Sequence, residues 1–190
     1  MGYRNVRAWG LLLAASMISA SLAWSQAEKK ITVESAAFKQ GEAIPLKYSA
    51  YGDNQSPPLN WKDLPEGTKQ LALICDDPDA PMPQPFVHWV IYNIPADAKG
   101  LPEALAADEV IEEPASVAGA IHGRNGIGQT RYFGPRPPAD GKVHHYHFKL
   151  FAIDADLDLK PGLNKTQLLE AIEGHVIGRG ELIGTYENKG

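Results

Sequence analysis

Two short segments of the chain combine residue types that can bind a small polar ligand or exchange protons with it. The first, Asp76–Pro81, places three aspartates in a turn held by two prolines, and His88 follows a few residues later. The second joins the proline-rich turn Gly134–Pro138 to the stretch His144–His147, which carries three histidines and a tyrosine. Proline restricts the backbone, so we expect a preorganised site of carboxylate, imidazole and phenol groups.

Strand alternation predicts on which face of a strand each histidine of the second segment lies. In an extended stretch over residues 142–153, His144 and Tyr146 share one face with apolar neighbours, and His145 and His147 share the other. An apolar face with a polar entrance suits a pocket wall. We therefore interpret His144 and Tyr146 as pocket residues, and His145 and His147 as an exposed pair.

The aspartates of the first segment have two interpretations. Asp is common in turns, where its side chain accepts hydrogen bonds from nearby backbone amides, and this alone could explain each of them. Alternatively, Asp77 or Asp79 orients His88, and such a carboxylate would raise the pKa of the imidazole.

Three functional readings follow from these groups. A metal site could use His145, His147 and an Asp, but the spacing fixes no third ligand, so we expect no bound metal and no cofactor. A hydrolase could use Asp and His as acid and base, but the chain has no Gly-x-Ser-x-Gly motif and no well-placed serine nucleophile. The third reading is a binding pocket in which His and Tyr side chains donate to an anion.

The N-terminal residues are typical of a secretory signal peptide. Arg4 and Arg7 precede an uncharged apolar stretch, and Ser25–Ala27 offers a cleavage site with small residues. We expect residues 1–27 to be removed, residues 28–190 to form one domain, and the protein to be periplasmic or secreted. An uncleaved membrane anchor is the alternative.

Composition narrows the classes of partner and of chemistry. Residues 28–190 hold 16 basic and 23 acidic residues, a net charge of −7, and no basic block, so nucleic acid is a poor partner. Cys75 is the only cysteine, which excludes an intrachain disulfide. It lies in an apolar run, and we expect it to be buried and unreactive.

The surrounding elements predict a mainly β, α+β protein, an antiparallel β-sandwich with a few peripheral helices. One helix is expected, starting at Asn164 as N-cap and ending near Gly174. Residues 100–109 are expected to be a short helix or irregular. The expected strands cover residues 31–33, 44–48, 71–75, 87–94, 142–153 and 182–186.

The two segments resemble the signature of the phosphatidylethanolamine-binding protein family, which includes the Raf kinase inhibitor proteins. The family pattern is Asp-Pro-Asp-Ala-Pro, a later His before an apolar strand, Gly-Pro-x-Pro-Pro, and His-x-Tyr; the chain matches it at Asp77–Pro81, His88, Gly134–Pro138 and His144–Tyr146. Ser56–Trp61 also resembles a family segment. The likeness is greater to the short, often exported bacterial members and covers essentially all of residues 28–190.

The resemblance implies a central antiparallel sheet packed on a second sheet, a helix near the C-terminus, and a pocket for phosphate, acetate or a phosphoryl head group. The pocket residues implied by motif position are Asp77, Asp79, Pro81, His88, Gly134, Pro135, His144 and Tyr146. Two residues depart from the family pattern: His145 replaces the usual Arg, and Arg136 replaces a frequent bacterial Cys.

The function expected from these observations is that of an exported, non-catalytic binding protein. Its expected ligand is a small anion or phosphoryl group. A hydrolase and a protein-inhibitor or interaction module, using the exposed segment 107–131, are the alternatives. The sequence allows a protein partner or a homodimer and does not decide between them.

Overall fold

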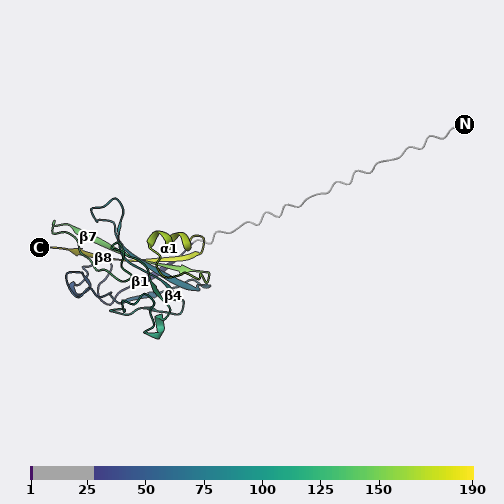
Figure 1. The fold of residues 1–190 in the computed structure, drawn as a ribbon, viewed down its shortest axis with the longest axis horizontal. Coiled ribbons are helices and arrows are strands. Elements are labelled where there is room, and N and C mark those ends of the chain that lie inside the picture. Colours follow the sequence, from purple (N-terminus) through teal and green to yellow (C-terminus); the bar gives the residue numbers. More distant parts are fainter. Residues whose placement is uncertain (2–27) are drawn as a thin grey trace.

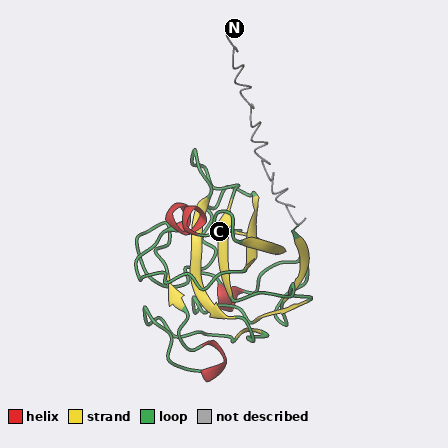
Figure 2. Ribbon diagram, turned by 90° about the vertical axis from the view of Figure 1, so that its right-hand side faces the viewer, coloured by secondary structure: helices red, strands yellow, loops and turns green. Residues whose placement is uncertain are grey.

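The computed structural model describes Met1 and residues 28–190, so the expected signal peptide lies outside the described residues apart from Met1. The chain forms one curled sheet of eight strands in the order β5-β2-β1-β8-β7-β3-β4-β6, with α1 against one face (Figures 1 and 2). The strands are β1 (Lys29–Glu34), β2 (Leu59–Lys62), β3 (Gln70–Asp77), β4 (Phe86–Pro95), β5 (Gly100–Leu101), β6 (Ile121–His122), β7 (Val143–Ile153) and β8 (Val176–Glu187). The helical elements are α1 (Lys165–Ala171) and the 3-10 turns η1 (Leu46–Tyr48) and η2 (Ala115–Val117).

Strand β1 connects the two layers of the sandwich. Its first half, Lys29–Ile31, pairs in parallel with β8, and its second half, Thr32–Glu34, pairs antiparallel with β2. The predicted mainly β sandwich is confirmed. The expected second sheet, β1-β2-β5, is joined to the main sheet through β1 rather than separate from it.

Both faces of the central strand β3 are buried. Every residue of β3 is buried, because alternate side chains enter two different cores. Leu71, Leu73 and Cys75 pack into the core between the main sheet and β1-β2-β5. Ala72 and Ile74 pack on the opposite face, into the core that α1 closes.

Helix α1 begins as predicted at Asn164. The Asn164 side chain accepts a hydrogen bond from the backbone N–H of Gln167, and the Gln167 side chain accepts one from the backbone N–H of Asn164. This reciprocal capping box satisfies two N–H groups that the first helical turn leaves unpaired. No helix among the described residues is both long and apolar enough to cross a membrane.

The expected strand at residues 44–48 is wrong. Ile44 donates one backbone hydrogen bond to Thr185 of β8, but the chain then turns into η1. Pro45 has no N–H and cannot continue the pairing. The last strand is longer than expected and starts at Val176, and the segment 100–109 contains the two-residue β5 followed by irregular structure.

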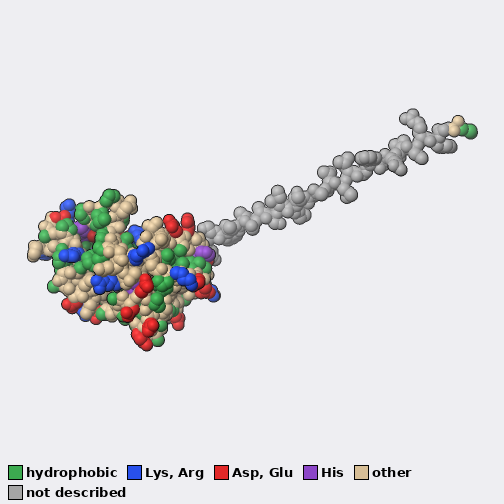
Figure 3. All heavy atoms as spheres, in the orientation of Figure 1, with side chains coloured by type: hydrophobic (Ala, Val, Ile, Leu, Met, Phe, Trp, Pro, Cys, Tyr) green, Lys and Arg blue, Asp and Glu red, His purple; other side chains and the backbone are tan. Residues whose placement is uncertain are grey.

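The segment proposed as an exposed loop, residues 107–131, is exposed in some stretches and buried in others. Residues 107–110 and 112–116 are exposed, and acidic side chains gather on this projection (Figure 3). Val117, Ala120 and Ile121 are buried, and β6 pairs with β4. Exposed residues recur at 124, 126–128 and 131, so the segment alternates between exposed stretches and buried anchors.

Candidate functional site

Strand alternation brings two of the predicted residues to one face of the sheet. His144 and Tyr146 of β7 are each 1% exposed, whereas His145 is exposed and His147 half-buried. The predicted division of the four side chains between two faces is therefore confirmed, but the expected exposure holds for His145 and only in part for His147. Asp77 ends β3 on the same face, beside β7, because β3 and β7 pair antiparallel.

A β-bulge puts His88 on this face too. Cys75 pairs with Trp89, but Asp76 pairs with Val87, so β4 contains one extra residue, His88, between the two pairs. A bulge of this kind interrupts the alternation and re-aims a side chain. The His88 and Tyr146 rings meet edge to face at 4.9 Å, which shows that they share a face.

Asp77 and His144 form a buried pair. The Nδ1 atom of His144 donates to Oδ2 of Asp77 at 2.7 Å, and both side chains are almost fully buried. The backbone N–H of Asp79 donates to the other oxygen, Oδ1, at 2.8 Å. Both carboxylate oxygens are thus engaged, and the imidazole is held in an orientation in which its Nε2 atom has no hydrogen-bond partner within residues 28–190.

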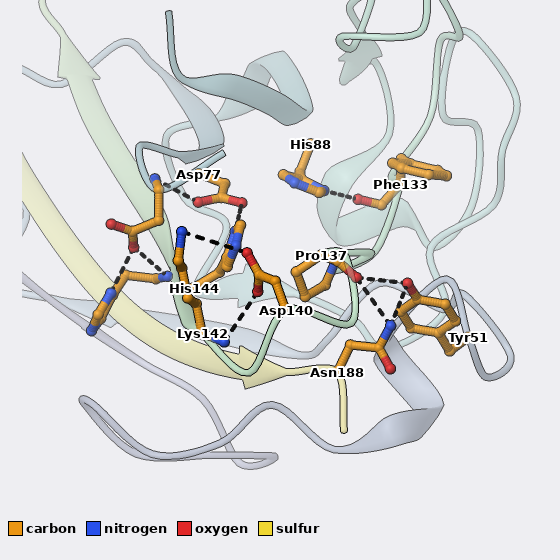
Figure 4. A network of polar contacts seen from close by, with 11 residues as sticks. Tyr51, Asp77, His88, Phe133, Pro137, Asp140, Lys142, His144 and Asn188 are labelled. Atoms are coloured by element: carbon orange, nitrogen blue, oxygen red, sulfur yellow. Dashed lines mark hydrogen bonds and ion pairs between the residues drawn. The ribbon is translucent and has the colours of Figure 1, made fainter. Parts of the chain in front are cut away.

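His88 is oriented by a carbonyl group rather than by an aspartate. Its Nδ1 atom donates to the backbone carbonyl of Phe133 at 2.6 Å, and the Phe133 N–H donates to the carbonyl of His88 (Figure 4). The expectation that Asp77 or Asp79 orients His88 is wrong, and burial outweighs the raising effect that the Asp77 charge has on the pKa of His88. Burial lowers the pKa of His88, against the opposing effects of the Phe133 backbone and the Asp77 charge.

The Tyr146 hydroxyl is the unusual group of the cluster. It is buried and has no hydrogen-bond partner among the described residues. Burial, helped by the nearby Asp77 charge, raises the pKa of this phenol, which therefore keeps its proton. Leaving a buried polar group unpaired costs about 1–3 kcal/mol, so such a group usually indicates a missing partner.

The loop that carries Phe133 is held by a distant turn. The backbone N–H of Gly134 donates to Oδ1 of Asn54 at 2.7 Å, and the Ala50 N–H donates to the Pro135 carbonyl at 3.0 Å. A Cβ atom on Gly134 would lie 2.2 Å from the Tyr48 carbonyl oxygen, so only glycine fits. Gly134 and Pro135 therefore act here through the backbone.

Two predicted site residues lie outside the buried cluster. Asp79 accepts from both the backbone N–H and the Nδ1 atom of His145, and its side chain is 42% exposed. Pro81 is exposed on the turn that follows. Burial would raise the pKa of Asp79, but the hydrogen bonds from His145 lower it overall.

The histidines proposed as metal ligands have separate partners. His145 pairs with Asp79, and Nδ1 of His147 donates to Glu181 at 2.8 Å. In the part of the chain that the structure describes, no three His, Cys, Asp or Glu side chains form a group that could hold a metal ion. Cys75 is buried as expected, and burial raises the pKa of its thiol.

The larger hollows of the molecule are elsewhere. One of about 820 Å³ lies between Glu28, Asp154 and the end of α1, and one of about 670 Å³ is lined by Lys30, Lys149 and Arg179. Both are open to solvent and hold no unpaired buried polar group of the described residues. The buried cluster is the stronger candidate site, because it holds the unpaired Tyr146 hydroxyl.

Sequence reasoning missed the bulge at His88 and the support from Asn54. No residue pattern identifies the bulge, because it appears only when the register of β3 and β4 is known. Asn54 has φ 56°, a left-handed conformation that Asn adopts more readily than most residues. Its role depends on a contact with a residue 80 positions away.

Comparisons with known proteins agree on one family. The family model described as phosphatidylethanolamine-binding protein matches residues 34–187. A UPF0098 protein of Pyrococcus horikoshii is 44% identical over 163 residues, which cover 85% of this chain and 80% of the relative. A UPF0098 protein of Methanothermobacter thermautotrophicus is 47% identical over 150 residues, which cover 79% and 94%.

Solved structures that superpose on this chain are described as members or homologues of the same family. A putative phosphatidylethanolamine-binding protein homologue from Chlamydia trachomatis superposes with a TM-score of 0.74 at 37% identity, over 85% of this chain and 99% of that one. Escherichia coli YbcL, described as a member of the mammalian family, superposes with a TM-score of 0.76 at 32% identity, over 84% and 99%.

Proposed function

The chain belongs to the phosphatidylethanolamine-binding protein family, and from this premise we propose that it binds a small oxyanion, such as phosphate or a phosphoryl group, at the buried cluster. The groups that would contact the ligand are the Tyr146 hydroxyl and the Nε2 atoms of His88 and His144. Asp77, Gly134 and Pro135 position them, while Asp79 and Pro81 shape the turn beside them.

The unpaired hydroxyl of Tyr146 carries this proposal. A phenol that keeps its proton is an obligatory donor in an apolar setting, and an anionic oxygen is the acceptor that would stabilise it most. The free Nε2 atoms of His88 and His144 belong to side chains on the same face. Both oxygens of Asp77 already accept hydrogen bonds, from His144 and from the backbone N–H of Asp79, so Asp77 supports the cluster rather than offering a donor to the anion.

The affinity of the Tyr146→Phe variant tests the site. The change removes only the hydroxyl, so phosphate binding should weaken roughly ten- to hundredfold, the equivalent of one charge-assisted hydrogen bond of about 1.5–3 kcal/mol. The free energy of unfolding without ligand should stay the same or rise, since an unsatisfied buried group is removed. Titration calorimetry and urea unfolding on the same samples measure both. Unchanged affinity with lowered stability would make the phenol a structural group and reject the site.

We also propose that the protein is non-catalytic. The only thiol, Cys75, is buried and its raised pKa disfavours the nucleophilic thiolate. The Asp77–His144 pair could serve as a base, yet among the described residues no hydrogen bond joins it to a serine or to a second carboxylate. Hydrolysis of p-nitrophenyl phosphate or acetate that is lost in His144→Ala would overturn this view.

Export to the periplasm or the medium is the third part of the proposal. It rests on the basic start, the apolar stretch and the Ser25–Ala27 site, with residues 28–190 as a single mature domain. N-terminal sequencing of protein from its native host should give Glu28 or a residue near it. An intact Met1 on protein in the cytoplasmic fraction would contradict export.

A further inference from the structure

A hollow of about 670 Å³ lies over β1, β8 and β7, on the face of the main sheet that carries α1. Lys30 of β1 pairs in register with Arg179 of β8, and Arg179 pairs with Phe151 of β7. Paired residues of neighbouring strands project to the same face of a sheet, so these side chains lie side by side. Lys149 and Gln40 also line the hollow. We call it the basic hollow, because three of its side chains are cationic.

Two donor groups of the basic hollow have no partner in the described part of the chain. Lys30 is exposed and forms no ion pair there. The side-chain oxygen of Gln40 accepts from a backbone N–H of β8 at 3.0 Å, which leaves the N–H₂ group of the amide for another acceptor. The two acids beside the hollow, Glu28 and Glu181, already accept from basic side chains. The basic hollow therefore offers donors to an incoming group of negative charge.

The segment 107–116, which we call the acidic projection, has the opposite charge. Residues 100–123 contain five acidic residues and no Lys or Arg. The exposed carboxylates of the projection, none of which forms an ion pair within the described residues, are those of Asp108, Glu109, Glu112 and Glu113. Two backbone hydrogen bonds of Ile111, each 2.8 Å long, hold the projection at its base. The carboxylates are therefore presented on an anchored segment.

The basic hollow and the acidic projection lie on opposite faces of the main sheet. Phe151, beside the hollow, belongs to the core that α1 closes. Ile111 and Val117, which anchor the projection, belong to the core between the main sheet and β1-β2-β5. Figure 1 shows α1 above the sheet and the segment around residue 115 below it. The projection therefore does not reach the hollow of its own chain, and a contact between the two must join two copies.

We propose that the acidic projection of one copy of this protein docks into the basic hollow of a second copy. The carboxylates of the projection meet the cationic side chains and the Gln40 amide of the hollow, and this complementarity of charge selects the partner surface. Each copy carries both halves of the contact on different surfaces, so the assembly is head-to-tail and forms a chain or a ring. The inference is independent of the proposed anion site.

The net charge of −7 on residues 28–190 does not prevent this contact. At physiological ionic strength exposed charges are screened beyond about 8 Å, so distant charges of two copies repel each other weakly while docked groups still attract. Single exposed ion pairs contribute little to binding, and several must act together. We therefore expect a weak association that depends on salt, rather than a permanent oligomer.

Sedimentation velocity over a series of protein concentrations measures the association. The wild type should associate in about 0.05 M NaCl, and its dissociation constant should rise at least roughly tenfold in about 0.5 M NaCl, where screening is stronger. Two variants reverse the charge of one half each: Lys30→Glu/Arg179→Glu alters the hollow, and Glu112→Lys/Glu113→Lys alters the projection. Each variant alone should stay monomeric. An equal mixture should associate again, because each variant offers the half that fits the other.

The matched control is Lys69→Glu/Lys99→Glu. It changes the net charge by the same amount as the hollow variant, at two exposed lysines that do not line the hollow, and should associate like the wild type. Loss of association in this control would attribute the effect to net charge and overturn the proposal.

Two further results would also overturn it. A wild type that is still monomeric at about 1 mM has no contact of useful strength. Association that persists in both charge-reversed variants, or that their mixture does not restore, would place the interface elsewhere. Circular dichroism checks that each variant is folded, and if one is not, the salt dependence of the wild type and the other variant still decide.

Discussion

At the scale of single residues, Asp77 determines which nitrogen of His144 is left for another partner. Its Oδ2 atom accepts from Nδ1 of His144, and its Oδ1 atom accepts from the backbone N–H of Asp79. Second-layer contacts of this kind commonly fix the tautomer of a functional histidine. A carboxylate beside an anion can either contact the anion or orient a neighbouring imidazole. The hydrogen bonds of Asp77 match the second role, because they hold the imidazole of His144.

The Asp77→Asn variant should reverse the tautomer of His144. The amide can keep its oxygen toward the Asp79 N–H, and its N–H₂ group would then face Nδ1, which must become an acceptor. We expect the imidazole hydrogen to move to Nε2 and phosphate affinity to fall roughly tenfold, because the imidazole loses the carboxylate that orients it. Nitrogen-15 NMR of the imidazole reports the tautomer. Asp79→Asn is the control, since its side chain contacts His145 outside the cluster; an Nδ1–H signal that persists in Asp77→Asn would contradict the assignment.

At the scale of elements, the strands that carry the cluster were predictable and their irregularities were not. Long apolar runs gave β3 and β4, and alternation gave the inward side of β7, because burial dictates these patterns. The bulge at His88 and the Phe133 carbonyl depend on register and on contacts between remote segments. The sequence alone therefore predicted an aspartate as the partner of His88, whereas the partner in the structure is the backbone carbonyl of Phe133.

Asn54 should control His88 through the loop that carries Phe133. Replacing Asn54 with Ala removes the acceptor of the Gly134 N–H and disfavours the left-handed backbone at residue 54. We expect the free energy of unfolding to fall by about 1–3 kcal/mol and phosphate binding to weaken. Asn54→Asp keeps an acceptor oxygen and should retain most of both. Urea unfolding and calorimetry measure these effects; wild-type affinity in folded Asn54→Ala would show that the loop does not position His88.

At the scale of the whole molecule, the main sheet separates two buried carboxylates that have different partners. Adjacent residues of β3 face opposite cores, so Asp77 enters the cluster while Asp76 faces α1. Asp76 is fully buried, and it accepts from Lys149 at 2.7 Å and from Lys165 of α1. Burial would raise the pKa of Asp76, but the hydrogen bonds and charges of the two lysines lower it overall. The ion pairs help hold α1 on the sheet.

Buried neutral histidines should make the folded protein sensitive to mild acid. His122 accepts from Nε1 of Trp89 at 3.0 Å through Nδ1, and its Nε2 atom donates to the Ala106 carbonyl at 3.0 Å, so it fits only as the neutral ring. Burial lowers the pKa of both His122 and His88, against the opposing effects of backbone carbonyls and, for His122, of Asp108. Below about pH 6.5 the unfolded chain therefore binds protons that the folded protein does not.

The sign of the pH dependence follows from these shifts. The free energy of unfolding should be highest above pH 6.5 and fall as the pH drops, by up to about 1.4 kcal/mol per pH unit for each of the two histidines. A further loss is expected below about pH 4, where the unfolded chain protonates Asp76 before the folded protein does.

The His122→Gln variant should reduce the loss of unfolding free energy that the wild type shows as the pH drops below about 6.5. A glutamine can accept from Trp89 through its oxygen and donate to Ala106 through its nitrogen, yet it does not titrate. Urea unfolding between pH 7.5 and 5, in a buffer without phosphate, should give a slope against pH about half that of the wild type, because His88 still titrates. His175→Gln, which alters an exposed imidazole paired with Asp154, is the matched control. Equal slopes in wild type and His122→Gln would show that the folded protein accommodates a charged His122, and the Trp89 contact would then not require the neutral ring.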